Sequence, residues 1–201
     1  MSAELYFLFD SHCPWSYATT KLVAHAQQSL PHLTIHFMPT GYYEGDNRVN
    51  KQAITDVKAL SDVDFGSKYQ EQLSGSQDST LVTNIIAWLQ AKNPSQTLKV
   101  LQALQHEHFV NGSPLTEKHD IDAVAQKLKL SIPNKCLQSE KYTKDAEYLL
   151  HDIAEIQEVI QTQAIPALLL AHNDDLVLLN HNLYLSDAKM FVESIELELN
   201  K

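Results

Sequence analysis

The apolar positions near the N-terminus change their period twice. Leu5–Phe9 is short, apolar and aromatic, which is typical of a buried strand. After Pro14 the apolar residues fall on one face of a helix, which we expect to end near Leu30–Pro31. From His32 to Met38 apolar and polar residues alternate with the period of a strand. This order predicts a parallel strand–helix–strand unit with a right-handed crossover.

The middle of the chain, residues 45–161, shows only helical periods. The clear apolar stripes lie at Leu81–Leu89, Leu98–Leu104, Ile121–Leu128 and Tyr142–Ile160. A weaker pattern over residues 48–74 is also interpreted as helical. We therefore expect an all-helical segment here.

The C-terminal part returns to strands. Ala167–Ala171 and Leu176–Leu179 are apolar and flank a turn at Asn173–Asp174, which predicts a hairpin. A last helix is expected to begin with Ser186 as its N-cap and to end near Leu199.

Together these elements predict an α/β protein with a thioredoxin-like fold. The first and last parts, β–α–β and β–β–α, would form one four-stranded mixed sheet with helices on its faces. The expected domains are a discontinuous thioredoxin-like domain, residues 1–44 and 162–201, and a large all-helical insertion, residues 45–161.

Composition narrows the range of functions. The 201 residues carry a net charge of −10 and no cluster of Lys and Arg, which argues against nucleic acid or an anionic membrane as a partner. No apolar stretch approaches the ~20 residues of a membrane span, and the N-terminal apolar run is interpreted as a strand, not as a secretory signal. We expect a cytoplasmic protein.

The stretch "DSHCPWSY" contains the main candidate chemistry, where the first strand passes into the first helix. Cys13 would lie at the helix N-cap, with Pro14 in the first turn. Free amides and the helix dipole there can lower a thiol pKa from ~8.5 to ~3.5–7.5. A protonated His12 would add to this effect, and Trp15 would cover one side of the sulfur. The alternative is a cysteine that only fills space in a turn.

A second candidate is Pro166 in "TQAIPALLL", directly before the third predicted strand. In thioredoxin folds this position holds a cis-proline beside the active cysteine, although only ~5–6% of X–Pro bonds are cis. A cis bond would leave the backbone of Ile165 free to pair with an extended substrate or with glutathione. The alternative is a trans proline that opens a strand.

The combination of these motifs resembles the DsbA family of thioredoxin-like proteins. It is similar to the FrnE-like branch and to its relatives, the 2-hydroxychromene-2-carboxylate isomerases and kappa-class glutathione transferases. The resemblance covers nearly the whole chain through "FDSHCPWSY", the run of helices ending in "FVNG", and "AIPALLL". It implies Cys13 as nucleophile, Pro166 as the cis-proline, and Ile165 as the residue that presents its backbone to a substrate.

Ser16 departs from the family pattern, because dithiol members have a second cysteine there. Without that cysteine, an outside thiol must release a disulfide on Cys13. We therefore expect a monothiol thiol–disulfide oxidoreductase with catalytic Cys13 and Ser16 and with no tightly bound cofactor. The expected substrate-binding residues are His12, Pro14, Trp15, Ile165 and Pro166. Glutathione is the expected co-substrate, protein thiols or disulfides are further partners, and a homodimer is left open.

Two other functions stay open. A glutathione-dependent transferase or isomerase could hold the glutathione sulfur with Ser16 or Ser11. A non-catalytic binding module could offer Trp15, Tyr42 and Tyr43 as aromatic surface. Tyr42 and Tyr43 lie either in a plain surface loop or along the groove above Cys13.

The remaining cysteine and the histidines give weaker signals. Cys136 is either a distant resolving thiol or, on the plainer interpretation, a partly buried helix cysteine. The ten histidines lack the count and spacing of a metal site, so no metal is expected.

Overall fold

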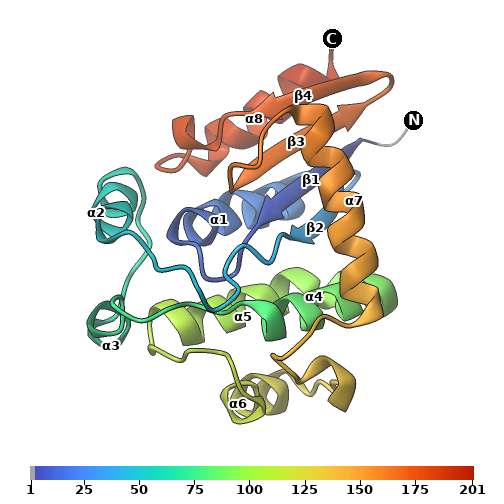
Figure 1. The fold of residues 1–201 in the computed structure, drawn as a ribbon. Helices are drawn as coiled ribbons and strands as arrows, with labels where there is room; N and C mark the ends of the chain where they lie inside the picture. The colour runs from blue at the N-terminus through green and yellow to red at the C-terminus, as the bar shows by residue number, and fades with distance from the viewer. Residues whose placement is uncertain (1–2) are drawn as a thin grey trace.

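A four-stranded mixed sheet forms the centre of the molecule (Figure 1). This computed structural model describes residues 3–201. The strands lie in the order β2-β1-β3-β4 and comprise β1 (Glu4–Phe9), β2 (Thr34–Pro39), β3 (Ala167–His172) and β4 (Asp175–Leu179). β1 pairs with β2 in parallel, whereas β1–β3 and β3–β4 are antiparallel. The predicted parallel unit and the predicted hairpin are both confirmed.

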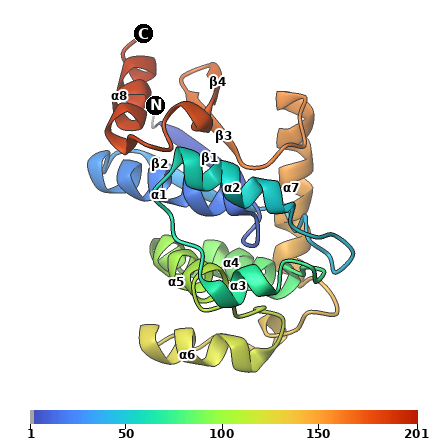
Figure 2. The same cartoon turned by 90° about the vertical axis from the view of Figure 1, so that its left-hand side faces the viewer.

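Helices cover both faces of this sheet (Figure 2). α1 (Pro14–Ser29) and α8 (Ala188–Leu199) pack together on one face. α7 (Lys144–Ile160) lies across the other face. Side chains of β1 alternate between the two layers, because successive residues of a strand point to opposite faces.

The two layers have separate apolar clusters. Leu5, Phe7 and Phe9 belong to the large core that includes α1 and α8. Leu8 joins Ile153 of α7 in the smaller cluster on the opposite face. The two central strands, β1 and β3, are therefore covered on both sides, as their apolar sequences predict.

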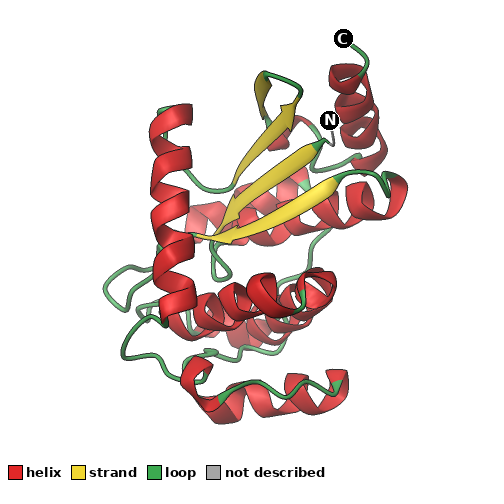
Figure 3. Ribbon diagram, turned by 90° about the vertical axis from the view of Figure 1, so that its right-hand side faces the viewer, coloured by secondary structure: helices red, strands yellow, loops and turns green. Residues whose placement is uncertain are grey.

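A helical lobe, defined here as α2 to α6, lies beside the sheet (Figure 1), and Figure 3 shows helices below the strands from another side. Its helices are α2 (Lys51–Leu60), α3 (Ser67–Glu71), α4 (Thr80–Lys92), α5 (Thr97–Phe109) and α6 (Lys118–Leu128). Short 3₁₀ helices occur at Pro94–Gln96, Asn134–Cys136 and His181–Leu183. The segment between β2 and β3 contains the predicted helices, together with an isolated bridge between Glu44 and Asp78. Among the described residues no helix is long and apolar enough to cross a membrane.

Two predicted helix starts need correction. Asp187, not Ser186, caps α8, because its carboxylate accepts hydrogen bonds from the backbone N–H groups of Lys189 and Met190. Thr143 caps α7, so Tyr142 lies outside that helix.

α7 also differs from its neighbours in the predicted insertion. It packs on the sheet, although the sequence pattern grouped it with residues 45–161. The domain boundaries themselves stay a prediction.

Candidate thiol site

Cys13 is the N-cap of α1, as predicted. Its backbone is extended (φ −84°, ψ 122°), and Pro14 occupies the start of the helix. The Cys13 N–H donates to the carbonyl of Asp10 at 3.1 Å, and the Tyr17 N–H donates to the Cys13 carbonyl at 2.9 Å. The sulfur is therefore held where a strand ends and a helix begins.

The Cys13 thiol is enclosed, with 6% of the residue exposed. Burial raises the pKa of this thiol, because a thiolate is poorly solvated in apolar surroundings. Donor groups of Ser16 and Trp15 oppose that rise, whereas the charge of Asp10 adds to it. The expected low pKa is therefore wrong for this state of the site, since burial outweighs the helix terminus.

Ser16 is fully buried and faces the turn before Cys13. Its Oγ accepts a hydrogen bond from the backbone N–H of Asp10 at 3.2 Å. Because an oxygen that accepts can also donate, the Ser16 hydroxyl proton remains for another partner. The hydroxyl is among the groups that lower the Cys13 pKa. A catalytic part for Ser16 stays a prediction.

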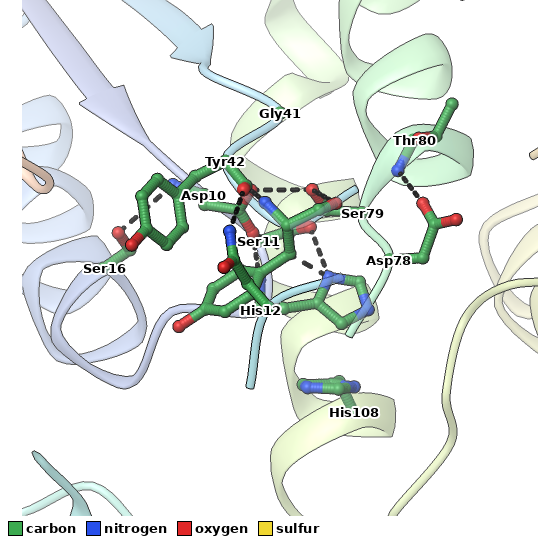
Figure 4. A network of polar contacts seen from close by, with 12 residues as sticks. Asp10, Ser11, His12, Ser16, Gly41, Tyr42, Asp78, Ser79, Thr80 and His108 are labelled. Carbon is green, nitrogen blue, oxygen red and sulfur yellow. Dashed lines mark hydrogen bonds and ion pairs between the residues drawn. The ribbon is translucent and has the colours of Figure 1, made fainter. Parts of the chain in front are cut away.

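A buried carboxylate, Asp10, organises the turn (Figure 4). Its Oδ1 accepts from the backbone N–H of His12 at 2.8 Å. Its Oδ2 accepts from the Ser79 hydroxyl at 2.6 Å and from the Tyr43 N–H at 3.2 Å. Three donors satisfy the buried charge, which would otherwise be costly. The carboxylate thus connects the turn, the segment after β2 and the start of α4.

His12 is an internal residue with no exposed surface. Nε2 must carry the proton, because its partner at 2.9 Å is the carbonyl oxygen of Pro114. Nδ1 then accepts from the Ser11 hydroxyl at 2.9 Å. Burial lowers the pKa of His12, although the charge of Asp10 opposes this. His12 is therefore neutral, contrary to the expected cationic aid to Cys13, and neither ring nitrogen is free for a substrate.

A series of rings continues from His12 into the helical lobe. The His12 and His108 ring centroids are 4.1 Å apart, and His108 lies 5.1 Å from Tyr69. His108 donates from Nδ1 to the carbonyl of Ser113 at 2.8 Å. Its Nε2 and the Tyr69 hydroxyl are both buried without a hydrogen-bond partner. Burial holds the pKa of His108 well below its usual range, so this imidazole is neutral as well.

The two tyrosines after β2 have different surroundings. Tyr42 is 52% exposed, whereas Tyr43 is buried in the apolar cluster that contains Cys13. Burial raises the pKa of Tyr43, and the charge of Cys13 raises it further. Tyr43 thus belongs to the surroundings of the thiol, whereas Tyr42 offers its side chain to solvent.

The Ile165–Pro166 peptide bond is cis, as predicted. Pro166 is buried, Ile165 is half-buried, and Trp15 packs half-buried against the main core. A hollow of about 330 Å³ opens at this segment and is lined by Thr162, Ala164, Pro166, Ala167, Leu178, Leu179, Asn180 and His181. Contact between Pro166 and Cys13 stays a prediction. The substrate-binding roles of His12, Pro14, Trp15, Ile165 and Pro166 stay predictions as well.

Cys136 is fully buried in the 3₁₀ helix Asn134–Cys136, which packs against α4. Both cysteines are free thiols. Burial raises the Cys136 pKa, which suits the plain interpretation of this residue as part of the core. Within residues 3–201, no three His, Cys, Asp or Glu side chains are grouped to hold a metal ion.

Four residues around the thiol were not predicted as part of the site: Asp10, Ser79, Tyr69 and His108. Asp10 left one signal, since a carboxylate that directly follows a buried strand and precedes a turn often accepts backbone hydrogen bonds. Tyr69 and His108 lie on α3 and α5, and Ser79 directly precedes α4, elements that the sequence does not place relative to Cys13. Only the packing of the helical lobe brings them to the site.

Comparison with known proteins supports the fold. No family model matches the chain, and no curated protein matches it in sequence. Two solved structures of a cytosolic disulfide reductase, DsbM from Pseudomonas aeruginosa, are 19% identical to it. One covers 98% of both chains with a TM-score of 0.84, and the other, with GSH, covers 98% of this chain and 100% of that chain with a TM-score of 0.82.

A more distant likeness is to a periplasmic thioredoxin-like protein from Salmonella enterica serovar Typhimurium. It is 11% identical and covers 100% of this chain and 86% of that chain, with a TM-score of 0.61. The chain therefore has the expected thioredoxin-like fold of the DsbA type. Its place in the FrnE-like branch stays a prediction.

Proposed function

We propose that this protein is a thiol–disulfide oxidoreductase that uses one reactive cysteine, Cys13, with glutathione as co-substrate. The observation that carries the proposal is the position of Cys13 at the N-cap of α1, among donor groups of Ser16 and Trp15 that favour the thiolate. A cysteine at this point lies next to the positive end of the helix dipole, which favours the thiolate. A residue that only filled space there would need no thiol.

The likeness to DsbM supports the class of reaction. That protein is described as a cytosolic disulfide reductase and has been solved with GSH. We therefore infer a reductase or exchange activity in a reducing cytoplasm, where the free thiols of Cys13 and Cys136 would persist.

The cycle follows from having one thiol at the site. The Cys13 thiol first loses its proton to solvent. The thiolate then attacks the glutathione sulfur of a mixed disulfide, a new S–S bond forms, and the substrate leaves as a thiolate that takes up a proton. Cys13 then carries glutathione.

Ser16 cannot resolve that intermediate, because an alcohol does not form a disulfide. A second glutathione thiolate attacks the glutathione sulfur on Cys13, which yields glutathione disulfide and regenerates Cys13. In the net reaction, the mixed disulfide and one free glutathione give the substrate thiol and glutathione disulfide, so the reducing equivalent comes from the glutathione that attacks in this second step. In this step the Cys13 sulfur is the leaving group, and the Ser16 hydroxyl can donate a hydrogen bond to the Cys13 thiolate that forms.

The test is the reduction of a glutathionylated peptide by glutathione, followed with wild type, Cys13→Ser and Cys136→Ala. We expect turnover in wild type and in Cys136→Ala, and none in Cys13→Ser. Intact mass of the reduced protein after treatment with oxidised glutathione should show one glutathione on wild type and none on Cys13→Ser.

Other outcomes would favour the other functions. Glutathione conjugation or isomerisation retained in Cys13→Ser would support the transferase or isomerase, with Ser16 holding the sulfur; Ser11 is already engaged with His12. Normal ligand binding by Cys13→Ala, with no wild-type turnover, would support the binding module.

A further inference from the structure

The hydroxyl of Tyr69 is an unused donor inside the protein. Tyr69 belongs to α3 of the helical lobe and is 2% exposed. Its oxygen has no hydrogen-bond partner. Buried hydroxyl groups normally have a hydrogen-bond partner, because a hydroxyl without one loses its hydrogen bonds to water and gains none in the protein. The Tyr69 hydroxyl is therefore available to a group that changes its charge or position during a reaction.

On one side, rings connect Tyr69 to the residue directly before Cys13. The Tyr69 ring lies 5.1 Å from that of His108, which in turn lies 4.1 Å from His12. His108 Nε2 is an acceptor without a partner, yet Tyr69 does not donate to it. The Tyr69 donor is thus not used by its nearest imidazole.

On the other side, rings connect Tyr69 to the first turn of α1. Tyr17 stacks on Phe109 with centroids 4.5 Å apart, and Phe109 lies 5.0 Å from Tyr69. Cys13 and Tyr69 also share one apolar cluster. The segments that flank Cys13 are therefore both packed, through one intervening ring each, against Tyr69.

The charge on Cys13 acts directly on this phenol. Burial raises the pKa of Tyr69 far above its usual value, and a negative charge on Cys13 raises it further. Tyr69 therefore stays protonated when Cys13 ionises, and remains a donor at the moment when a thiolate needs one. A hydrogen bond to the charged form of a group favours that form.

We propose that Tyr69 is a catalytic residue whose hydroxyl donates a hydrogen bond to the Cys13 sulfur when that sulfur is a thiolate. This assignment rests on the thiol exchange proposed above. Tyr69 keeps its own proton throughout, and the Cys13 proton passes to solvent. The helical lobe then supplies part of the thiol chemistry, which compensates for the burial that opposes ionisation of Cys13.

The test measures the pH midpoint of Cys13 alkylation by iodoacetamide, in a Cys136→Ala background so that one thiol reacts. Tyr69→Phe keeps the ring and removes the donor. We expect its midpoint to rise by about one pH unit, which means about tenfold less thiolate at pH values below the midpoint. Tyr148→Phe is the matched control, because Tyr148 is 72% exposed on α7 and its midpoint should not move.

Tyr43→Phe is the decisive comparison, because Tyr43 is the second phenol on which the Cys13 charge acts. A rise in Tyr43→Phe with no rise in Tyr69→Phe would overturn the assignment, as would an unchanged midpoint in a Tyr69→Phe protein with native near-UV circular dichroism. If Tyr69→Phe does not fold, 3-fluorotyrosine at position 69 keeps the packing and strengthens the donor. The midpoint should then fall, and an unchanged value would also overturn the assignment.

This readout is separate from the proposed function. Alkylation needs no glutathione, so a wild-type protein without glutathione turnover still reports on Tyr69. Conversely, normal turnover with no effect of Tyr69→Phe on the midpoint would leave the oxidoreductase in place and remove Tyr69 from its site.

Discussion

The Ser79 hydroxyl donates to Oδ2 of Asp10 at 2.6 Å, and both residues are buried. This bond joins the turn that precedes Cys13 to the N-cap residue of α4 in the helical lobe. Because Asp10 also accepts from the backbone of His12 and Tyr43, one carboxylate holds three segments together. The position of the thiol therefore depends on the helical lobe as well as on the sheet.

Ser79→Ala should destabilise the protein by about 1.5–3 kcal/mol, the usual contribution of a hydrogen bond to a charged group. The substitution leaves a buried carboxylate with one donor fewer. Urea denaturation monitored by circular dichroism measures the change. Ser95→Ala is the control, because Ser95 is exposed and should change stability by less than about 0.5 kcal/mol. If both variants lose the same free energy of unfolding, the Ser79–Asp10 hydrogen bond does not contribute as expected.

Stability should fall as the pH drops below about 6.5, the usual histidine pKa. Burial lowers the pKa values of His12, His108 and His181 in the folded state, the last to about 4. The unfolded chain therefore binds protons first, and the stability present above pH 6.5 is lost towards lower pH. Each group contributes a slope of at most about 1.4 kcal/mol per pH unit.

Urea unfolding at several pH values between 7 and 4 tests this dependence. His181→Gln should flatten the curve between about pH 6.5 and pH 4. His106→Gln should leave the curve as it is, because His106 is exposed on α5. A wild-type curve that is level over the whole range would refute the neutral state of these three histidines in the folded protein.

Ser16→Ala should raise the pH midpoint of Cys13 alkylation. The wild-type midpoint is already expected above that of a free thiol, because burial raises the Cys13 pKa. Removing the Ser16 hydroxyl takes away one of the groups that oppose this rise. Ser29→Ala, at the exposed end of the same helix, is the control. A wild-type midpoint below that of a free thiol would show that the helix terminus outweighs burial.

Ser16→Cys should create an intramolecular disulfide with Cys13. Residues three apart at the start of a helix lie within the Cα separation that a disulfide requires. The oxidised variant should be two hydrogens lighter by intact mass, and the reduced variant should reduce a peptide disulfide once without glutathione. Ser29→Cys should do neither, because its thiol lies at the far end of α1. If Ser16→Cys stays fully reduced under mild oxidation, the helix start does not allow this geometry.

The sequence predicted the architecture because its elements have strong local periods. The apolar run Leu5–Phe9 and the hairpin around Asn173 are visible without any partner, and the predicted four-stranded mixed sheet follows from them. The start of the last helix was predicted one residue too early, since Ser186 and Asp187 are adjacent and both residue types are good caps. Asp187 is the N-cap because its carboxylate accepts hydrogen bonds from two backbone N–H groups.

The site was only partly predictable, for a physical reason. The N-cap position of Cys13 follows from neighbouring residues, but its pKa depends on burial by residues far away in the chain. Tyr69 and His108 lie on helices whose packing angle no local pattern encodes. The neutral state of His12 likewise depends on burial by distant residues, and its tautomer depends on the Pro114 carbonyl in the loop after α5.

The bond from His12 to Pro114 spans 102 residues and has a consequence for biosynthesis. At a translation rate of about 5–20 residues per second, Pro114 is made roughly 5–20 s after His12. During that interval the growing chain carries the Cys13 turn without the helical lobe that encloses it. Shielding of the thiol is therefore a late event, and the newly made chain passes through a stage in which Cys13 meets cellular oxidants without the protection it has when mature.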